Sequence, residues 1–274
     1  MELYRAKPGD GVAWVTGASK GIGRELALKL AARGYTVAAS ARDEERLAEL
    51  AAGAEGLPGR IAAFPCDVTE PAEVLDAVRA VERSAGPIVL AVFNAGSYFP
   101  TRGERLDINS IEKTFQINLF GVLNGMIPVV ELMRARGKGQ IMLVGSASSF
   151  FGWPSASAYG ASKAALNNMA EALRYDFDKM NIRLQIVNPG FVDTPLTERT
   201  AFRMPFLMEA DKAAERLAAA IEHGGFETTF PRRLTWMLKA IGLMPHRARF
   251  RLVNRLTGWK ARPMAPQRKP RASE

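Results

Sequence analysis

Short apolar segments alternate with amphipathic helical segments along most of this chain, and this alternation constrains the fold more than any other feature. Strands that alternate with helices pair in parallel, with helices on both faces of the sheet. The sequence therefore predicts an α/β fold with a doubly wound parallel sheet, whose ligands bind outside the carboxyl ends of the strands. We expect strands near 12–16, 35–40, 61–65, 88–93, 140–145 and 183–188, and helices near 22–33, 43–52, 71–84, 110–135 and 158–180.

A glycine-rich turn joins the first expected strand to the first expected helix. Glycines at 17, 21 and 23 allow a tight turn and let a pyrophosphate approach the helix N-terminus, where free N–H groups and the helix dipole favour anions. The spacing is G-x-x-x-G-x-G rather than the G-x-G-x-x-G of the dinucleotide fingerprint. Taken alone, the turn fits a purely structural role as well as cofactor binding.

A tyrosine and a lysine stand four residues apart in a helical segment. Tyr159 and Lys163 therefore lie on the same helix face, one turn from each other. A neighbouring ammonium favours the phenolate, so we expect Lys163 to lower the pKa of Tyr159 from about 10. Ser146 lies thirteen residues upstream of Tyr159, at the end of an expected strand. On its own, the Tyr–Lys spacing also fits an ordinary surface pair.

Together these segments resemble the short-chain dehydrogenase/reductase family in its single-domain form, over roughly residues 10–225. The resemblance implies a Rossmann-like catalytic domain over 1–230 that moves hydride between a nicotinamide and a carbonyl or alcohol. It rests on the TGxxxGxG turn, on the YxxxK pair with Ser146, and on further motifs in family order: Asp67-Val68, Asn94-Ala95-Gly96, Asn118, and Asn188-Pro189-Gly190-Phe191-Val192-Asp193-Thr194.

The resemblance implies four catalytic residues: Asn118, Ser146, Tyr159 and Lys163. Tyr159 would exchange a proton with the substrate oxygen, and Lys163 would hold the nicotinamide ribose. Ser146 would donate a hydrogen bond to the substrate oxygen as charge builds on it. Asn118 would anchor a water that links Lys163 to solvent, although a polar residue there could also simply kink the helix.

For the cofactor, the resemblance implies NADP(H) rather than NAD(H). The family's acidic position is Ala41 here, and the guanidinium of Arg42 can fork onto a phosphate. The resemblance places Lys20 beside the same phosphate as a second cation. Alternatively, Arg42 and Lys20 are exposed side chains that contact only solvent. Asp43 is expected to cap the next helix. The implied cofactor contacts are Gly17, Ser19, Lys20, Gly21, Ile22, Gly23, Arg42, Asp67 (to the adenine), Val68, Asn94, Ala95, Gly96, Tyr159, Lys163, Pro189, Gly190, Val192 and Thr194 (to the carboxamide).

Apolar residues come directly after several of the sequence motifs, in segments that would surround a substrate. An apolar lining favours a lipophilic ketone or aldehyde over a sugar, although several of these residues would also suit core or interface positions. Ser146, Tyr159 and Lys163 are all present, which disfavours a non-catalytic NADP-binding regulator or scaffold. The glycine spacing disfavours a sugar-nucleotide dehydratase or epimerase. The expected lining comprises Tyr98, Phe99, Phe150, Phe151, Trp153, and, within 195–208, Leu196, Phe202, Met204, Pro205, Phe206, Leu207 and Met208.

The net charge of +9 is concentrated at the C-terminus. From Pro231 onward there are 12 basic residues and one acidic residue, whereas 1–230 carries 25 basic and 27 acidic residues. The sequence predicts a basic amphipathic extension over 231–274, with a disordered tail near 263–270. Such a helix suits an anionic membrane surface. A lid, an oligomer contact and a solvated helix are alternatives; nucleic acid is not expected, because no recognition module accompanies the charge.

Composition excludes several other classes. The single cysteine, Cys66, cannot form an intramolecular disulfide, and two histidines give no metal-ligand spacing, so no metal is expected. The start lacks the apolar core of a secretory signal, and no apolar run of 18 residues predicts a spanning helix. We expect a cytoplasmic protein; where the extension is a membrane contact, the inner face of the membrane is the expected location. The resemblance implies a homodimer or homotetramer formed through the helices near 110–135 and 158–180.

Overall fold

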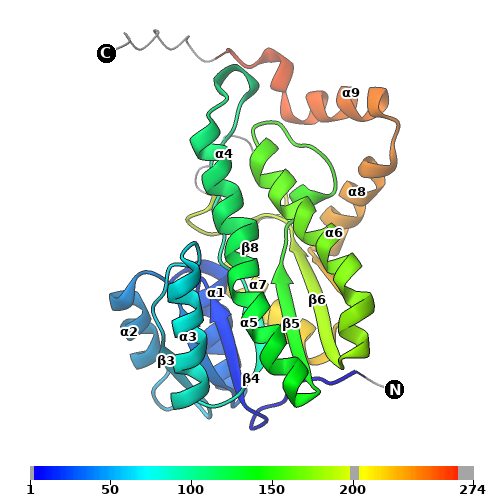
Figure 1. Cartoon of the computed structure of the whole chain (residues 1–274). Coiled ribbons are helices and arrows are strands. Elements are labelled where there is room, and N and C mark those ends of the chain that lie inside the picture. Colours follow the sequence, from blue (N-terminus) through cyan, green and yellow to red (C-terminus); the bar gives the residue numbers. More distant parts are fainter. Residues whose placement is uncertain (1–2, 198–203, 265–274) are drawn as a thin grey trace.

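The computed structural model describes residues 3–197 and 204–264, and a seven-stranded parallel sheet forms its centre (Figure 1). The strand order is β3-β2-β1-β4-β5-β6-β9, so the winding direction reverses between β1 and β4. Six strands were predicted and are confirmed, whereas β9 was not predicted. The strands are β1 (Val12–Thr16), β2 (Thr36–Ser40), β3 (Arg60–Ala63), β4 (Ile88–Phe93), β5 (Gly139–Val144), β6 (Ile182–Pro189) and β9 (Glu227–Phe230).

Helices cover both faces of the sheet, as the alternation predicts. Side chains along each strand alternate between the two faces: Trp14 and Phe93 belong to one apolar cluster, and their neighbours Val15 and Val92 belong to the other. Because both faces of the sheet are buried, the sequences of its central strands are continuous runs of apolar residues. One face carries α1 (Gly21–Ala32), α2 (Glu44–Ala52) and α7 (Ala210–His223); the other carries α3 (Pro71–Ser84), α4 (Ile108–Phe115), α5 (Gly121–Arg136) and α6 (Ser157–Lys179).

The long helix predicted near 110–135 is interrupted. A π-helical turn, Gln116–Phe120, separates α4 from α5. By length and composition alone, the helical stretch Ile108–Arg136 is apolar enough to cross a membrane, which the sequence reading did not anticipate. In this fold α5 packs against α3 and β4. The packing is close at Gly125, where a Cβ would lie 2.7 Å from Cε1 of Phe93.

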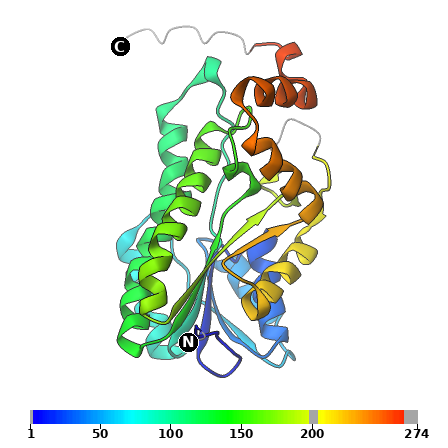
Figure 2. The ribbon, with the colours of Figure 1, turned by 90° about the vertical axis from the view of Figure 1, so that its right-hand side faces the viewer.

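Two helices after β9 lie at the carboxyl end of the sheet (Figures 1 and 2). They are α8 (Arg232–Leu243) and α9 (His246–Thr257). Leu234, Leu238 and Ile241 of α8 are buried in an apolar cluster with Phe151 and with Val253 of α9. The start of the extension therefore packs on the catalytic body. Most of the tail expected to be disordered, from residue 265 onward, lies outside the described residues.

Candidate active site

The carboxyl ends of the central strands border a cleft of about 720 Å³. Most of the residues that the sequence assigned to the site line it. Two of the assigned residues, Gly23 and Asn118, are buried and do not line the cleft. The expected residues that line the cleft are Gly17, Ser19, Lys20, Gly21, Ile22, Arg42, Asp67, Val68, Asn94, Ala95, Gly96, Ser146, Tyr159, Lys163, Pro189, Gly190, Val192 and Thr194.

The glycine turn leaves the start of α1 open toward this cleft. Gly17 and Gly21 have φ angles of +67° and +56°, which favour glycine. At Gly23 a Cβ would lie 2.3 Å from the Gly17 carbonyl oxygen, so this glycine permits the helix to approach the turn. Lys20 occupies the N-cap position without a side-chain capping hydrogen bond. The first N–H groups of α1 are thus not capped by that side chain, an arrangement that suits an anion.

Asn94 holds the glycine turn in place from β4. Its Nδ2 donates to the carbonyl oxygens of Thr16 and Gly17, both at 3.1 Å. The Thr16 hydroxyl in turn accepts from the backbone N–H groups of Asn94 and Ala95. The Asn94 side chain therefore serves the turn itself, and its nearest partners are protein backbone. The Asn94 motif therefore has a structural role in this fold.

Cations gather at the end of the cleft beyond β2. The Arg42 side chain is 70% exposed, and its Nη1 lies 3.5 Å from Asp67 Oδ2. Burial on its own raises the pKa of Asp67, but hydrogen bonds from Thr69 and the charge of Arg42 outweigh burial and lower that pKa below its ordinary value. The Arg42 guanidinium is therefore exposed to solvent and also forms an ion pair with Asp67. Asp43 accepts a hydrogen bond from the Arg46 N–H at 3.1 Å, which confirms the predicted helix cap.

Ser146, Tyr159 and Lys163 come together where β5 ends and α6 begins. The Ser146 hydroxyl is hydrogen-bonded to the Tyr159 phenol and accepts from the Ser148 N–H at 3.1 Å. The Tyr159 ring packs edge-on against Tyr98, with ring centroids 5.4 Å apart. Lys163 is buried, and its Nζ donates to the Val144 carbonyl oxygen at 2.7 Å. The spacing of these residues in the sequence therefore corresponds to a real cluster in the cleft.

Burial dominates the electrostatics of this cluster. It raises the pKa of Tyr159 above its ordinary value, while the hydrogen bond from Ser146 lowers it and Tyr98 raises it further. Burial lowers the pKa of Lys163 to about 8. The expectation that Lys163 would bring the pKa of Tyr159 below its ordinary value does not hold in this structure, because removing the groups from water favours the neutral form of each.

Asn118 clamps the loop after β4 to α6. It is fully buried in the π-helical turn. Its Oδ1 accepts from the Ser97 N–H at 2.7 Å, and its Nδ2 donates to Ser97 O and to Ser162 Oγ. Asn118 Oδ1 and Lys163 Nζ both approach Gly96, at 3.4 and 3.5 Å from the position of a Cβ there. These contacts give Asn118 a structural role. The water-anchoring role expected for Asn118 stays a prediction, and its position in a π-helical turn is compatible with it, because such turns recur at functional sites.

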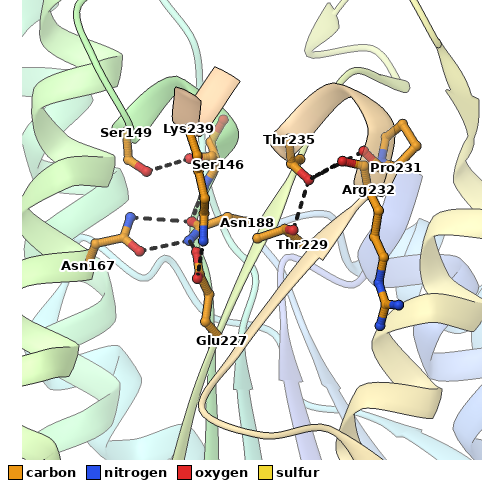
Figure 3. A network of polar contacts seen from close by, with 10 residues as sticks. All are labelled: Ser146, Ser149, Asn167, Asn188, Glu227, Thr229, Pro231, Arg232, Thr235 and Lys239. Carbon is orange, nitrogen blue, oxygen red and sulfur yellow. Dashed lines mark hydrogen bonds and ion pairs between the residues drawn. The ribbon is translucent and has the colours of Figure 1, made fainter. Parts of the chain in front are cut away.

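A polar network that the sequence analysis missed supports Ser146 from behind (Figure 3). Asn188, buried at the end of β6, accepts from the Ser146 N–H at 2.9 Å. Its Nδ2 donates to Asn167 Oδ1 at 2.8 Å and to Glu227 Oε1 at 3.1 Å. Glu227 also forms an ion pair with Lys239 of α8. Asn188 belongs to a recognised motif, but its role depends on β9, which the sequence did not predict.

The side of the cleft where the sequence predicts the substrate has an apolar wall. Two of its residues, Leu234 and Leu238, come from α8 and were not predicted to be there. The others were expected. This wall contains Tyr98, Phe99, Trp153, Leu196, Leu234 and Leu238.

The remaining residues expected in this lining either do not line the cleft or lie outside the described residues. Phe150 and Phe151 pack with the buried face of α8 rather than in the cleft wall. Phe206 and Leu207 are largely exposed, at 54% and 46%. Met208 lies in β8 (Met208–Glu209), which pairs with β7 (Val192–Asp193). Phe202 lies outside the described residues.

Comparisons with known proteins agree with this geometry. Residues 11–203 match the model of the short chain dehydrogenase family. An uncharacterized oxidoreductase of Myxococcus xanthus is 35% identical over 234 residues, covering 85% of this chain and 92% of that protein. A 3-oxoacyl-[acyl-carrier-protein] reductase of Thermotoga maritima is 34% identical over 188 residues, covering 69% and 76%. The crystal structure of a short-chain type dehydrogenase/reductase from Mycobacterium marinum is similar with a TM-score of 0.75 and 26% identity, covering 81% and 94%.

Proposed function

The chain belongs to the short-chain dehydrogenase family, and from this premise we propose that it reduces a lipophilic ketone or aldehyde with NADPH. Family membership gives the coarser statement that it is an oxidoreductase acting on CH–OH or C=O groups. The observation that carries the proposal is the meeting of Ser146, Tyr159 and Lys163 in a cleft whose adjoining wall is apolar.

The described residues fit a nicotinamide dinucleotide. The glycine turn would receive the pyrophosphate, because Gly17 and Gly21 bring backbone rather than side chains to the cleft. Lys20 and Arg42 stand at the adenosine end, and Ala41 there carries no carboxylate to repel a 2′-phosphate. Lys163 would hold the ribose at the nicotinamide end. These features support NADP(H) as the preferred cofactor.

The catalytic work of the chain is proton transfer and charge stabilisation. When bound, the nicotinamide supplies or takes up hydride. In reduction, Tyr159 Oη donates a proton to the carbonyl oxygen, and Ser146 Oγ donates a hydrogen bond to that oxygen as charge builds. The pKa of Lys163, about 8, allows its amino group to exchange protons near neutral pH and replace the proton that Tyr159 gives up.

The apolar wall supports the lipophilic substrate. Leu196, Leu234 and Leu238 would exclude water from an acyl or ring portion of the substrate. The Thermotoga maritima relative is named for a 3-oxoacyl substrate, which is a ketone attached to an acyl chain. We propose a carbonyl compound of this general kind.

Copies of the chain are proposed to associate through α5 and α6, as the family resemblance implies. Ile127 on α5 and Tyr175 on α6 are large side chains with 57% and 77% of their surface exposed, which is compatible with a subunit contact.

Oxidation of NADPH and NADH by the purified protein, against 3-keto esters of increasing chain length and against short polar ketones, tests the proposal. We expect NADPH to be preferred and kcat/KM to rise by up to about fourfold for each methylene that becomes buried. Equal activity along the series, or turnover of polar ketones alone, would reject the lipophilic substrate. A preference for NADH would reject the proposed cofactor.

A further inference from the structure

The helix α8 is apolar on two opposite faces. Its inner face, with Leu234, Leu238 and Ile241, is buried against the body. Its outer face carries Trp236 and Leu243, seven residues apart and therefore on one side of the helix, with 71% and 89% of their surface exposed. Large apolar side chains at this exposure, aligned on one side, mark an interaction surface rather than scattered surface residues.

The next helix, α9, presents exposed cations. Arg247, Arg251 and Arg255 follow one another at intervals of four residues and are exposed on α9. Phe250, 60% exposed, lies among them. Residues 231–264 contain nine Lys and Arg residues and no Asp or Glu. The helical pair thus offers apolar groups and positive charge together.

We propose that the α8–α9 surface, formed by Trp236, Leu243, Phe250, Arg247, Arg251 and Arg255, docks the protein on an anionic phospholipid bilayer. The arginines complement the lipid phosphates, and the apolar side chains enter the boundary between headgroups and acyl chains, where tryptophan is favoured. A nucleic acid would use only the charge and leave Trp236 and Leu243 in water. A two-fold contact between copies through this surface would bring two sets of arginines into one interface, where residues 231–264 offer no Asp or Glu to neutralise them, which is unfavourable.

The position of the surface gives the docking a consequence. Figures 1 and 2 show α8 and α9 together at the carboxyl end of the sheet. The inner face of the same α8 supplies Leu234 and Leu238 to the cleft wall. Docking through the outer face of α8 therefore brings one wall of the cleft to within a helix diameter of the bilayer. This inference rests on exposure and charge, and it does not depend on the proposed reaction.

Co-sedimentation of the full chain with vesicles tests the docking. Vesicles of phosphatidylcholine alone are compared with equal mixtures of phosphatidylglycerol and phosphatidylcholine. We expect binding to the mixed vesicles only, weakened at about 0.5 M NaCl. Both W236S/L243S and R247E/R251E/R255E should bind more than about tenfold more weakly. The matched control R60E/R83E/R216E makes the same change of charge at exposed positions elsewhere and should bind like the wild type.

Several outcomes overturn the proposal. They are the absence of binding to mixed vesicles by the wild type, equal losses in the two charge-reversal variants, and unchanged binding by W236S/L243S. A fall in oligomeric state in W236S/L243S without vesicle binding would assign the surface to a contact between copies. Binding of a DNA duplex in place of vesicles, unaffected by W236S/L243S, would assign it to nucleic acid. Thermal unfolding checks each variant; because Trp236 and Leu243 are exposed, their replacement tests docking even where the arginine variant is less stable.

Discussion

At the residue scale, Tyr159 and Lys163 are governed by burial. The four-residue spacing correctly places both on one side of α6, next to Ser146. It does not reveal the sign of the pKa shifts, because those depend on how much water the surrounding strands and helices remove. Here both groups are pushed toward their neutral forms. The protonated phenol of Tyr159 is suited to act as a proton donor, and the amine of Lys163, four residues away on the same helix, exchanges protons readily.

The buried Lys163 should leave a signature in the pH dependence of stability. Its folded pKa is about 8, below the ordinary 10.5. Between these values the unfolded chain binds a proton at Lys163 that the folded chain does not, so the stability contributed by this group rises with pH. Relative to Lys163→Met, the wild type should gain up to a few kcal/mol of unfolding free energy between about pH 8 and about pH 10. Urea denaturation of both proteins measures it; parallel pH profiles would contradict the shift.

Arg42 should determine the choice of cofactor. Replacing it with alanine would remove the proposed charge-assisted bond to a 2′-phosphate, worth about 1.5–3 kcal/mol. We expect Arg42→Ala to weaken NADPH binding by at least about tenfold and to leave NADH binding unchanged. Titration of cofactor fluorescence measures both constants. Arg79→Ala, at an exposed position on α3, is the control, and equal losses for the two cofactors in Arg42→Ala would refute the role.

At the element scale, local patterns predicted most of the fold, and long-range packing determined the rest. Runs of apolar residues identified six strands and the helices between them. The seventh strand, Glu227–Phe230, is short and mostly polar, and it is a strand because it pairs with β6. The π-helical turn at Asn118 requires one extra residue in a helix, which apolar periodicity does not reveal.

The same division holds for the candidate site. Residues in recognised motifs, such as Gly17 and Tyr159, were placed correctly in the cleft because the motif itself forms the local structure. Leu234 and Leu238 were read as part of a separate extension, although they line the cleft. The sequence indicates no separate role for Asn188, because its partner Glu227 lies on a strand that the sequence does not predict. The sequence alone therefore did not predict the contacts between segments that lie far apart in the chain.

The glycine turn gives a test at this scale. Gly23→Ala would push a Cβ toward the Gly17 carbonyl oxygen and toward Asn94 Nδ2, at 2.3 and 2.4 Å. We expect the turn to shift and NADPH binding to fall by at least about tenfold. Gly103→Ala is the matched control, because a Cβ there meets nothing within 4 Å. If Gly23→Ala binds NADPH like the control, the turn does not shape the cofactor site.

At the scale of the whole molecule, the order of the strands explains why one cleft serves both proposed ligands. Because the winding reverses between β1 and β4, the loops after these strands diverge and leave a crevice. The residues proposed to hold the cofactor lie at and after the carboxyl ends of β1, β2, β3, β4 and β6, and the proposed catalytic cluster lies where β5 ends and α6 begins. The C-terminal helices then return to the carboxyl end of the sheet and complete the apolar side.

We propose that Tyr159 donates the proton during carbonyl reduction, and Tyr159→Phe removes the hydroxyl that would carry this proton. Single-turnover oxidation of NADPH with the best ketone of the series would be compared in wild type and variant, together with NADPH binding. We expect unchanged NADPH affinity and a rate at least about a hundredfold lower in the variant, because the variant keeps the ring but lacks the proton donor. If the variant binds NADPH and keeps a rate within a few-fold of the wild type, Tyr159 is not the proton donor.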